Sequence, residues 1–238
     1  MPMISRRLFG CIGMGAVAAS VTACVGLDGL SSTGDGEGLS ANRNGSTIAH
    51  PDYAEVYAPY RGERFPVPAV NYRSINPSLL RQQVAYYGRE QPGTVVVDPS
   101  SHFLFLVEPD GRATRYGVGV GREGFGWSGQ AEINLHRSWP DWVPPKDMIE
   151  RTPEIQTELE PTPRGLGVRG GPKSPLGARA LYLFAEGRDL GYRIHGTTEP
   201  WTIGSDVSSG CIRMINQDVI HLYGRAPDGT PVVVLASA

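Results

Sequence analysis

Short apolar runs separated by turn residues fill the second half of the chain and restrict it to a β-rich fold. The chain has 31 glycines and 20 prolines among 238 residues, which is too many helix-breaking residues for a helical bundle. From Gly93 onward, runs of Val, Leu and Phe alternate with turn sequences such as Asp98-Pro99-Ser100-Ser101. Runs of this length bounded by turns are typical of strands. The sequence therefore predicts a mainly β domain.

The expected strands follow one another at short intervals. They cover residues 94–97, 102–107, 112–120, 127–139, 178–185, 191–194 and 231–235. One stretch between them, residues 152–175, is rich in Pro and Gly and long for a connection without structure of its own. We expect it to be a functional loop near the site.

Helices are expected at three places. The best marked one has Asn216 as its N-cap and Gly224 at its C-terminal stop. Two weaker ones are expected over residues 144–151 and 77–87, each beginning at a proline.

The first residues have the pattern of an export signal. Ser5-Arg6-Arg7-Leu8-Phe9 is a twin-arginine pattern, followed by an uncharged, small-residue stretch up to Ala23. Val21-Thr22-Ala23-Cys24 resembles a bacterial lipobox, in which the signal is cleaved before a cysteine that becomes lipid-modified. We expect residues 1–23 to be a signal peptide and Cys24 to anchor a periplasmic protein to a membrane. A plain signal peptide and a retained anchor are the alternatives.

Composition divides the rest of the chain and excludes one class of partner. Residues 24–50 are Gly, Ser, Asn and Asp rich and are expected to be a flexible tether. Residues 51–91 are expected to form an irregular arm that packs on the domain of residues 92–238.

The formal net charge is −2, and no basic run occurs, so no nucleic-acid partner is expected.

Of the three cysteines in the sequence, one is expected to remain unmodified in the mature domain. Cys11 departs with the signal and Cys24 would carry lipid, so Cys211 has no partner for an intramolecular disulfide within the chain. Such a cysteine is either buried and inert or reactive. The five histidines are scattered, and neither C-x-x-C nor H-E-x-x-H occurs. We therefore expect no metal site and no cofactor.

Two nearby motifs contain the groups that a cysteine nucleophile needs. His195-Gly196-Thr197 precedes Ser208-Ser209-Gly210-Cys211-Ile212-Arg213-Met214. Acyl transfer requires a thiol, a base and N–H groups that stabilise an oxyanion. Cys211 is the candidate nucleophile and His195 the candidate base. The N–H of Cys211, with that of Gly210 or a near neighbour, is the candidate oxyanion hole.

The residues around the pair have both functional and structural interpretations. Arg213 shares a face with Cys211 in an extended segment, so it would bind a substrate carboxylate, stabilise the thiolate, or brace the loop through backbone carbonyls. Thr197 and Trp201 are candidate substrate-binding residues, with loop capping as the alternative for Thr197. Gly196 and Ser209 are candidate loop residues of the oxyanion region.

These residues resemble the L,D-transpeptidase family with the YkuD-type catalytic domain, over about residues 93–235. The resemblance depends on the two motifs above, Pro200, Ile203-Gly204, Pro175-Leu176-Gly177 and Tyr116-Gly117-Val118-Gly119-Val120-Gly121. It implies a mostly antiparallel β-sandwich or flattened barrel with one helix beside the site. Many members have His where this chain has Ser209, which leaves open any contribution of a second histidine.

The resemblance also implies a reaction. Cys211 would attack the carbonyl after the third residue of a peptidoglycan tetrapeptide stem, releasing D-alanine and leaving a thioester. An amine on another stem or on an outer-membrane lipoprotein would then resolve the thioester, with His195 as base and proton donor. The alternatives are a hydrolase that resolves the same thioester with water, and a non-catalytic wall-binding lipoprotein.

Overall fold

The computed structural model describes residues 40–41, 47–48, 51–121, 127–208 and 210–236. All of them belong to one unit, Gly38–Ala238. Cys24 and Ser209 lie outside the described residues. The strands are β1 Ser40–Ala41, β2 Thr47–Ile48, β3 Gln82–Ala85, β4 Val95–Asp98, β5 Phe103–Glu108, β6 Arg112–Gly117, β7 Val120–Gly121, β8 Gly129–Ser138, β9 Glu160–Thr162, β10 Gly165–Gly167, β11 Arg179–Ala185, β12 Arg188–His195, β13 Asp206–Ser208, β14 Ile212–Arg213 and β15 Thr230–Val234. The helices are α1 Tyr53–Val56, α2 Lys146–Arg151 and α3 Asn216–Tyr223, with 3-10 turns η1 Tyr72–Ser74, η2 Pro77–Leu79, η4 Pro153–Glu158 and η5 Pro200–Thr202.

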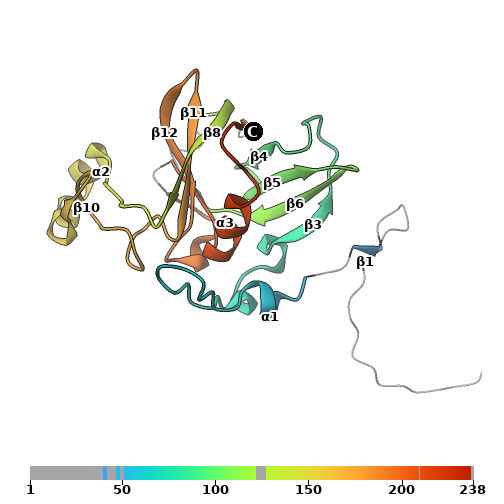
Figure 1. Ribbon diagram of the computed structural model, residues 1–238, viewed down its shortest axis with the longest axis horizontal. Helices are drawn as coiled ribbons and strands as arrows, with labels where there is room; N and C mark the ends of the chain where they lie inside the picture. The colour runs from blue at the N-terminus through green and yellow to red at the C-terminus, as the bar shows by residue number, and fades with distance from the viewer. Residues whose placement is uncertain (1–39, 42–46, 49–50, 122–126, 209, 237–238) are drawn as a thin grey trace, which may run out of the picture. The chain divides into compact units, whose positions relative to one another are not determined.

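Nine strands form one large sheet in the order β14-β12-β11-β8-β15-β4-β5-β6-β3. Most pairings are antiparallel, but β12 pairs with β14 and β15 pairs with β4 in parallel. The order has two ends, so the described sheet does not close into a barrel. In Figure 1, β8, β11 and β12 stand on one side of α3, and β3 to β6 lie on the other. The predicted mainly β, mostly antiparallel fold is confirmed, with two parallel pairings in the large sheet and no closed barrel among the described strands.

One hydrophobic core joins the strands to α3. Apolar residues of β4, β5, β8, β11 and β15 pack in one cluster with Val219 and Leu222 of α3, which are fully buried. Ile194 of β12 and Ile212 of β14 also belong to this cluster. Their neighbours in the chain, His195 and Cys211, therefore point away from this core, because side chains alternate between the two faces of a sheet.

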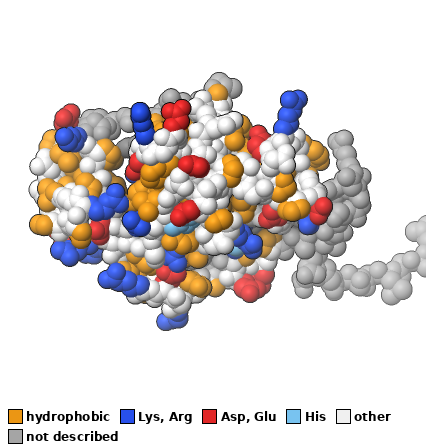
Figure 2. All heavy atoms as spheres, turned by 45° about the horizontal axis from the view of Figure 1, so that its top comes forward, with side chains coloured by type: hydrophobic (Ala, Val, Ile, Leu, Met, Phe, Trp, Pro, Cys, Tyr) orange, Lys and Arg blue, Asp and Glu red, His pale blue; other side chains and the backbone are white. Residues whose placement is uncertain are grey.

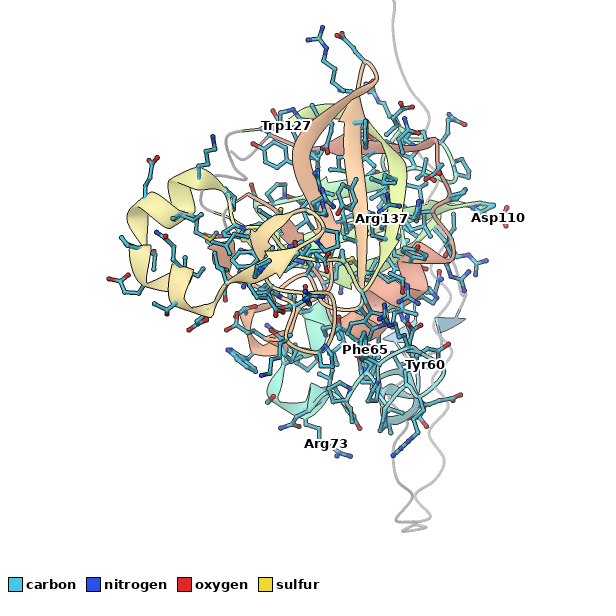
Figure 3. The ribbon with its side chains drawn as sticks, turned by 60° about the vertical axis from the view of Figure 1, so that its left-hand side comes forward. Tyr60, Phe65, Arg73, Asp110, Trp127 and Arg137 are labelled. Atoms are coloured by element: carbon cyan, nitrogen blue, oxygen red, sulfur yellow. The ribbon has the colours of Figure 1, made fainter. Side chains whose placement is uncertain are left out.

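The segment of residues 51–91 packs against the sheet and α3. Tyr57 is 1% exposed, and its hydroxyl donates to Asp218 Oδ2 of α3 at 3.1 Å. The Nε of Arg81 lies 3.7 Å from the other oxygen of Asp218. Figure 3 shows Tyr60 and Phe65 of this segment at one end of the molecule and Trp127 nearer the other end. The segment is thus fixed to the helix that follows Cys211.

The helix expected over residues 77–87 is wrong. Only the turn η2 is helical there, and residues 82–85 form β3, which pairs with β6 through Gln82↔Arg115 to Ala85↔Arg112. An open strand edge at β6 offered backbone hydrogen bonds that outweigh local helix propensity.

The other predicted elements agree better with the structure. The expected strands correspond to β4, β5, β6 with β7, β8, β11, β12 and β15, and the helices over 144–151 and 216–224 to α2 and α3. The expected loop 152–175 contains the turn η4 and the hairpin β9–β10.

The surface mixes charges of both signs. Figure 2 shows acidic and basic side chains interspersed with apolar ones over one face of the molecule. No helix among the described residues is long and apolar enough to cross a membrane.

Candidate active site

The two motifs meet at one edge of the sheet, where β12 and β14 run in parallel. Their register pairs Ile194 with Ile212 and His195 with Arg213, so Arg193 lies opposite Cys211. Residues two apart on a strand share a face, and paired residues of parallel strands point the same way. Arg193, His195, Cys211 and Arg213 therefore lie on the face opposite the core. Hydrogen bonds from Met214 N to the His195 carbonyl (2.8 Å) and from Arg213 N to the Gly119 carbonyl (2.7 Å) fix β14 in place.

His195 is held in one tautomer. Its Nδ1 lies 2.6 Å from the carbonyl oxygen of Gly196, and because a carbonyl only accepts, Nδ1 carries the proton. In the neutral ring, Nε2 is then a lone-pair acceptor. Burial lowers the pKa of His195 to about 4, the charges of Arg213 and Arg193 act in the same direction, and the Gly196 hydrogen bond opposes them. At neutral pH the imidazole is an uncharged base.

Cys211 is a thiol in the resting structure. Burial raises its pKa above the ordinary value, and a hydrogen bond from the backbone of Arg193 together with the charges of Arg193 and Arg213 partly offsets this effect. A neutral thiol with a neutral imidazole is therefore the resting state.

Cys211 opens into a cavity of about 140 Å³. Its lining combines aromatic and apolar groups with two arginines and one aspartate: Asp141, Trp142, Val143, Pro145, Arg164, Leu176, Tyr182, Gly191, Arg193 and Cys211. The cavity lies between the edge of the sheet and the segments around α2 and the β9–β10 hairpin, which lie together in Figure 1. Charged groups of both signs, Asp141, Arg164 and Arg193, therefore face this cavity together with Cys211.

The two arginines of this cavity are held around Tyr182. Arg164, in the turn of the β9–β10 hairpin, donates from Nη1 to the Tyr182 hydroxyl at 2.6 Å. Arg193 lies over the Tyr182 ring at 3.9 Å and pairs with both oxygens of Asp189, at 2.6 and 2.7 Å. Arg193 is thus largely neutralised, whereas Arg164 is exposed and keeps N–H groups available to a carboxylate.

Two glycines of the motifs are required by geometry. Gly210 is buried and has φ +106°, a conformation that other residues rarely adopt. A Cβ on Gly196 would collide with the Oδ1 atom of Asn216. The turns beside His195 and Cys211 therefore depend on glycine.

Arg213 and Thr197 make structural contacts. Arg213 Nη1 lies 3.3 Å from Glu199 Oε2, and Arg213 lines neither the Cys211 cavity nor the larger one described below. Thr197 is 4% exposed, and its Oγ1 accepts from the Glu199 N–H at 3.0 Å. Together these contacts brace the loop after His195, and the charge of Arg213 reaches both reactive groups.

Asn216 does not cap α3, contrary to the sequence-based expectation. Ile215 occupies the N-cap position. Asn216 Oδ1 accepts from Ala178 N at 2.9 Å, and its Nδ2 donates to the Thr197 carbonyl at 2.8 Å. The side chain thus joins α3 to β11 and to the loop after His195.

Trp201 lies away from the Cys211 cavity. It is 70% exposed and lines a different cavity of about 300 Å³. The described residues contain no group of three or more His, Cys, Asp or Glu side chains placed to hold a metal ion.

Four polar residues of the Cys211 cavity were not among the predicted site residues: Asp141, Arg164, Tyr182 and Arg193. Arg193 had a usable signal, because it lies two residues before His195 on the same strand face. Arg164 lies within residues 152–175, which are expected from their composition to lie near the site, and the cavity lining agrees with that expectation. Asp141 and Tyr182 come from segments that only the tertiary structure brings to Cys211.

Comparison with known proteins identifies the family. Residues 92–234 match the model of the YkuD family, the L,D-transpeptidase catalytic domain, and the chain belongs to that family. It is 30% identical over 188 residues to probable L,D-transpeptidase ErfK/SrfK of Escherichia coli (strain K12), covering 76% of this chain and 52% of that protein. It is 34% identical over 119 residues to probable L,D-transpeptidase YbiS of the same strain, covering 48% of this chain and 35% of that protein.

The chain therefore spans about half or less of the length of these relatives. A solved structure described as a probable carnitine operon oxidoreductase from Brucella melitensis is 49% identical and covers 69% of this chain and 99% of its own, with a TM-score of 0.46. No activity is inferred from that likeness.

Proposed function

We propose that the protein is a peptidoglycan L,D-transpeptidase with Cys211 as its nucleophile. Membership of the family supports the reaction class. The observation that supports the assignment of the residues is the parallel pairing of β12 with β14, which aligns Cys211 with Arg193, two residues from His195. The substrate is the tetrapeptide stem of peptidoglycan, and the exposed Arg164 in the Cys211 cavity suits one of its carboxylates.

The reaction begins with proton transfer within the pair. Nε2 of His195 takes the proton of Cys211 while the sulfur attacks the carbonyl carbon after the third stem residue. The carbon–nitrogen bond to the terminal D-alanine breaks, and the imidazolium returns the proton to the leaving amino group. A thioester on Cys211 remains. An amine of a second stem or of an outer-membrane lipoprotein attacks it and releases the thiol.

Four features assist these steps. The Gly196 carbonyl keeps the proton on Nδ1 and becomes a partner of the imidazolium when it forms. The charges of Arg193 and Arg213 favour the thiolate. Arg164, in the same cavity as Cys211, binds a carboxylate of the stem. The N–H groups of Cys211 and Gly210 hold the oxyanion.

Incubation with purified tetrapeptide muropeptides, followed by mass spectrometry, tests the proposal. Dimers with 3-3 crosslinks, absent from a Cys211→Ala control, would support it. Tripeptides without dimers would identify a hydrolase. No product from a protein that still forms a covalent adduct with a carbapenem-type β-lactam would point to a lipoprotein amine as acceptor. A protein that forms neither product nor adduct would be a non-catalytic adaptor.

We also propose that the enzyme works in the periplasm, anchored by lipid on Cys24. The twin-arginine pattern and the Val21-Thr22-Ala23-Cys24 sequence support this location.

A further inference from the structure

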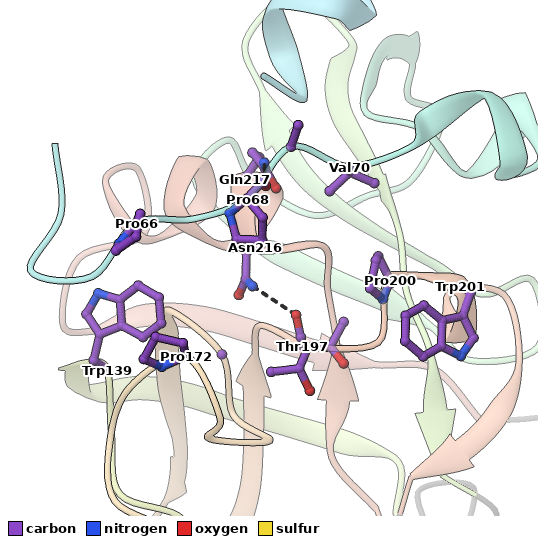
Figure 4. A pocket seen from close by; sticks show the side chains of 13 residues that line it. Pro66, Pro68, Val70, Trp139, Pro172, Thr197, Pro200, Trp201, Asn216 and Gln217 are labelled. Atoms are coloured by element: carbon purple, nitrogen blue, oxygen red, sulfur yellow. Dashed lines mark hydrogen bonds between the residues drawn. The ribbon is translucent and has the colours of Figure 1, made fainter. Parts of the chain in front are cut away.

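The larger cavity, of about 300 Å³, lies beside the reactive pair and differs from the Cys211 cavity in its chemistry. None of the described residues that line it is charged. Four prolines and two tryptophans give it apolar walls, and two threonines and two amide side chains give it hydrogen-bonding groups. Figure 4 shows the indoles of Trp139 and Trp201 at opposite ends, with Thr197 and Asn216 between them.

One wall of this cavity lies outside the residues that match the family model. It consists of Pro66, Pro68, Ala69 and Val70, which precede the matched residues 92–234; the other lining residues lie within that range. The N-terminal wall is held in place by Gln217, whose Nε2 donates to the Pro68 carbonyl at 2.9 Å and to the Ala58 carbonyl at 3.1 Å. The N-terminal segment therefore completes a cavity that the catalytic domain alone would leave open on one side.

The two cavities lie on either side of the same segments. Leu176 lines the Cys211 cavity and its neighbour Gly177 lines the larger one, and consecutive Cα atoms are about 3.8 Å apart. Likewise, Asp141 lines the Cys211 cavity, and Trp139, two residues earlier, lines the larger one. The two cavities are therefore neighbours in space, and the backbone around residues 176–177 adjoins both.

We propose that the larger cavity binds the neutral N-acetylated sugars of the glycan strand whose stem peptide enters the Cys211 cavity. This rests on the proposed function, because a glycopeptide is the substrate. Its peptide part is anionic and suits Arg164, whereas its sugars are uncharged and suit an uncharged lining. The indole of Trp201 is 70% exposed, so its face is accessible to a ligand. The C–H face of a sugar ring would pack on it, while hydroxyl and acetamide groups bond to Thr198 and Thr197.

The proposal requires both subsites to lie within reach of one glycopeptide. Three stem residues separate the sugar from the scissile carbonyl, and an extended tripeptide spans about 10 Å.

Titration with peptide-free chitotriose, followed by saturation-transfer NMR and tryptophan fluorescence, tests the proposal. We expect saturable binding, weakened at least about tenfold in Trp201→Ala and in Ala69→Leu, which narrows the cavity from its other wall. Tyr87→Ala is the matched control, because Tyr87 is 92% exposed and does not line the cavity; it should bind like the unaltered protein. The sugar needs no acyl transfer, so the titration stays readable even if Cys211 proves not to be the nucleophile.

Two results would overturn the proposal. One is the absence of saturable chitotriose binding, or equal binding by all three variants. The other is displacement of chitotriose by the stem tetrapeptide without sugar, which would make the cavity a peptide site. Retention of the sugar in the presence of that peptide would support the division into two subsites.

Discussion

Replacing Tyr57 by Phe should loosen the N-terminal segment from α3. The Tyr57 hydroxyl donates to Asp218 at 3.1 Å and accepts from the Arg81 N–H at 2.8 Å. A hydrogen bond to a charged group contributes about 1.5–3 kcal/mol, and a neutral one about 1 kcal/mol. Tyr57→Phe should therefore lower the free energy of unfolding by about 3 kcal/mol at pH 8. For a domain of this size that is a Tm decrease of about 6–12 °C.

The loss of unfolding free energy in Tyr57→Phe should be smaller at low pH than at high pH. Burial raises the pKa of Asp218 to about 7, whereas Arg81 and the Tyr57 hydrogen bond lower it; the pKa of an unfolded aspartate is about 3.9. Protonation of Asp218 in the folded protein contributes stability that is fully present below about pH 4 and is lost as the pH rises through about 7. Tyr57 stabilises the carboxylate, so its hydroxyl matters most where Asp218 is charged. At pH 5 the loss should shrink to about 1–2 kcal/mol.

Thermal unfolding of the unaltered protein and of Tyr57→Phe at pH 5 and pH 8 measures the loss of stability at each pH. Tyr72→Phe is the control, because its ring packs 6.1 Å from that of Tyr57; its Tm should change little. Equal losses at the two pH values, or a Tyr57→Phe loss no larger than that of the control, would refute the reasoning.

Three further predictions concern the reaction and the anchor. His195→Ala should slow β-lactam acylation of Cys211 by about 10²–10⁴-fold, measured by mass spectrometry; a rate and pH profile like those of the unaltered protein would exclude His195 as the base. Arg164→Ala should raise KM for the tetrapeptide about tenfold with a small change in kcat, as expected for the loss of a charge-assisted hydrogen bond. Arg169→Ala, on the same hairpin and paired with a surface glutamate at 3.5 Å, should leave KM unchanged, and equal effects of the two variants would count against a carboxylate contact. Cys24→Ala should abolish incorporation of labelled palmitate in cells; continued labelling would place the lipid elsewhere.

The strands could be predicted because each is encoded locally. Residues 94–97, 178–185 and 231–235 are short apolar runs bounded by turns, and the structure has strands β4, β11 and β15 there. The strand at residues 82–85 could not be predicted in this way, because it forms by pairing with β6, about 30 residues away in the sequence. Local propensity there favours a helix that tertiary pairing overrides.

The candidate site could be predicted only along β12 and β14. The motifs identify His195 and Cys211 because both lie in short, characteristic sequences. Arg164 enters the same cavity from a hairpin far away in the sequence; the Pro- and Gly-rich composition of residues 152–175 indicates a loop near the site, but not which of its side chains reaches Cys211. Asn216 was misassigned for a related reason: its side chain bonds to Ala178 and Thr197, and these long-range partners outweigh a capping role.

Because β12 pairs with β14 in parallel, the relative positions of His195 and Cys211 do not depend on the length of the loop that connects the two strands. Neighbouring strands lie about 4.8 Å apart whatever connects them, so the register Ile194↔Ile212 positions Cys211 without help from the loop. That loop supplies Thr197, Thr198 and Trp201 to the larger cavity. Under the proposed function, insertions or exchanges within this loop would alter which wall fragment binds, while His195 and Cys211 keep their spacing. Substrate range would then evolve independently of the reactive pair.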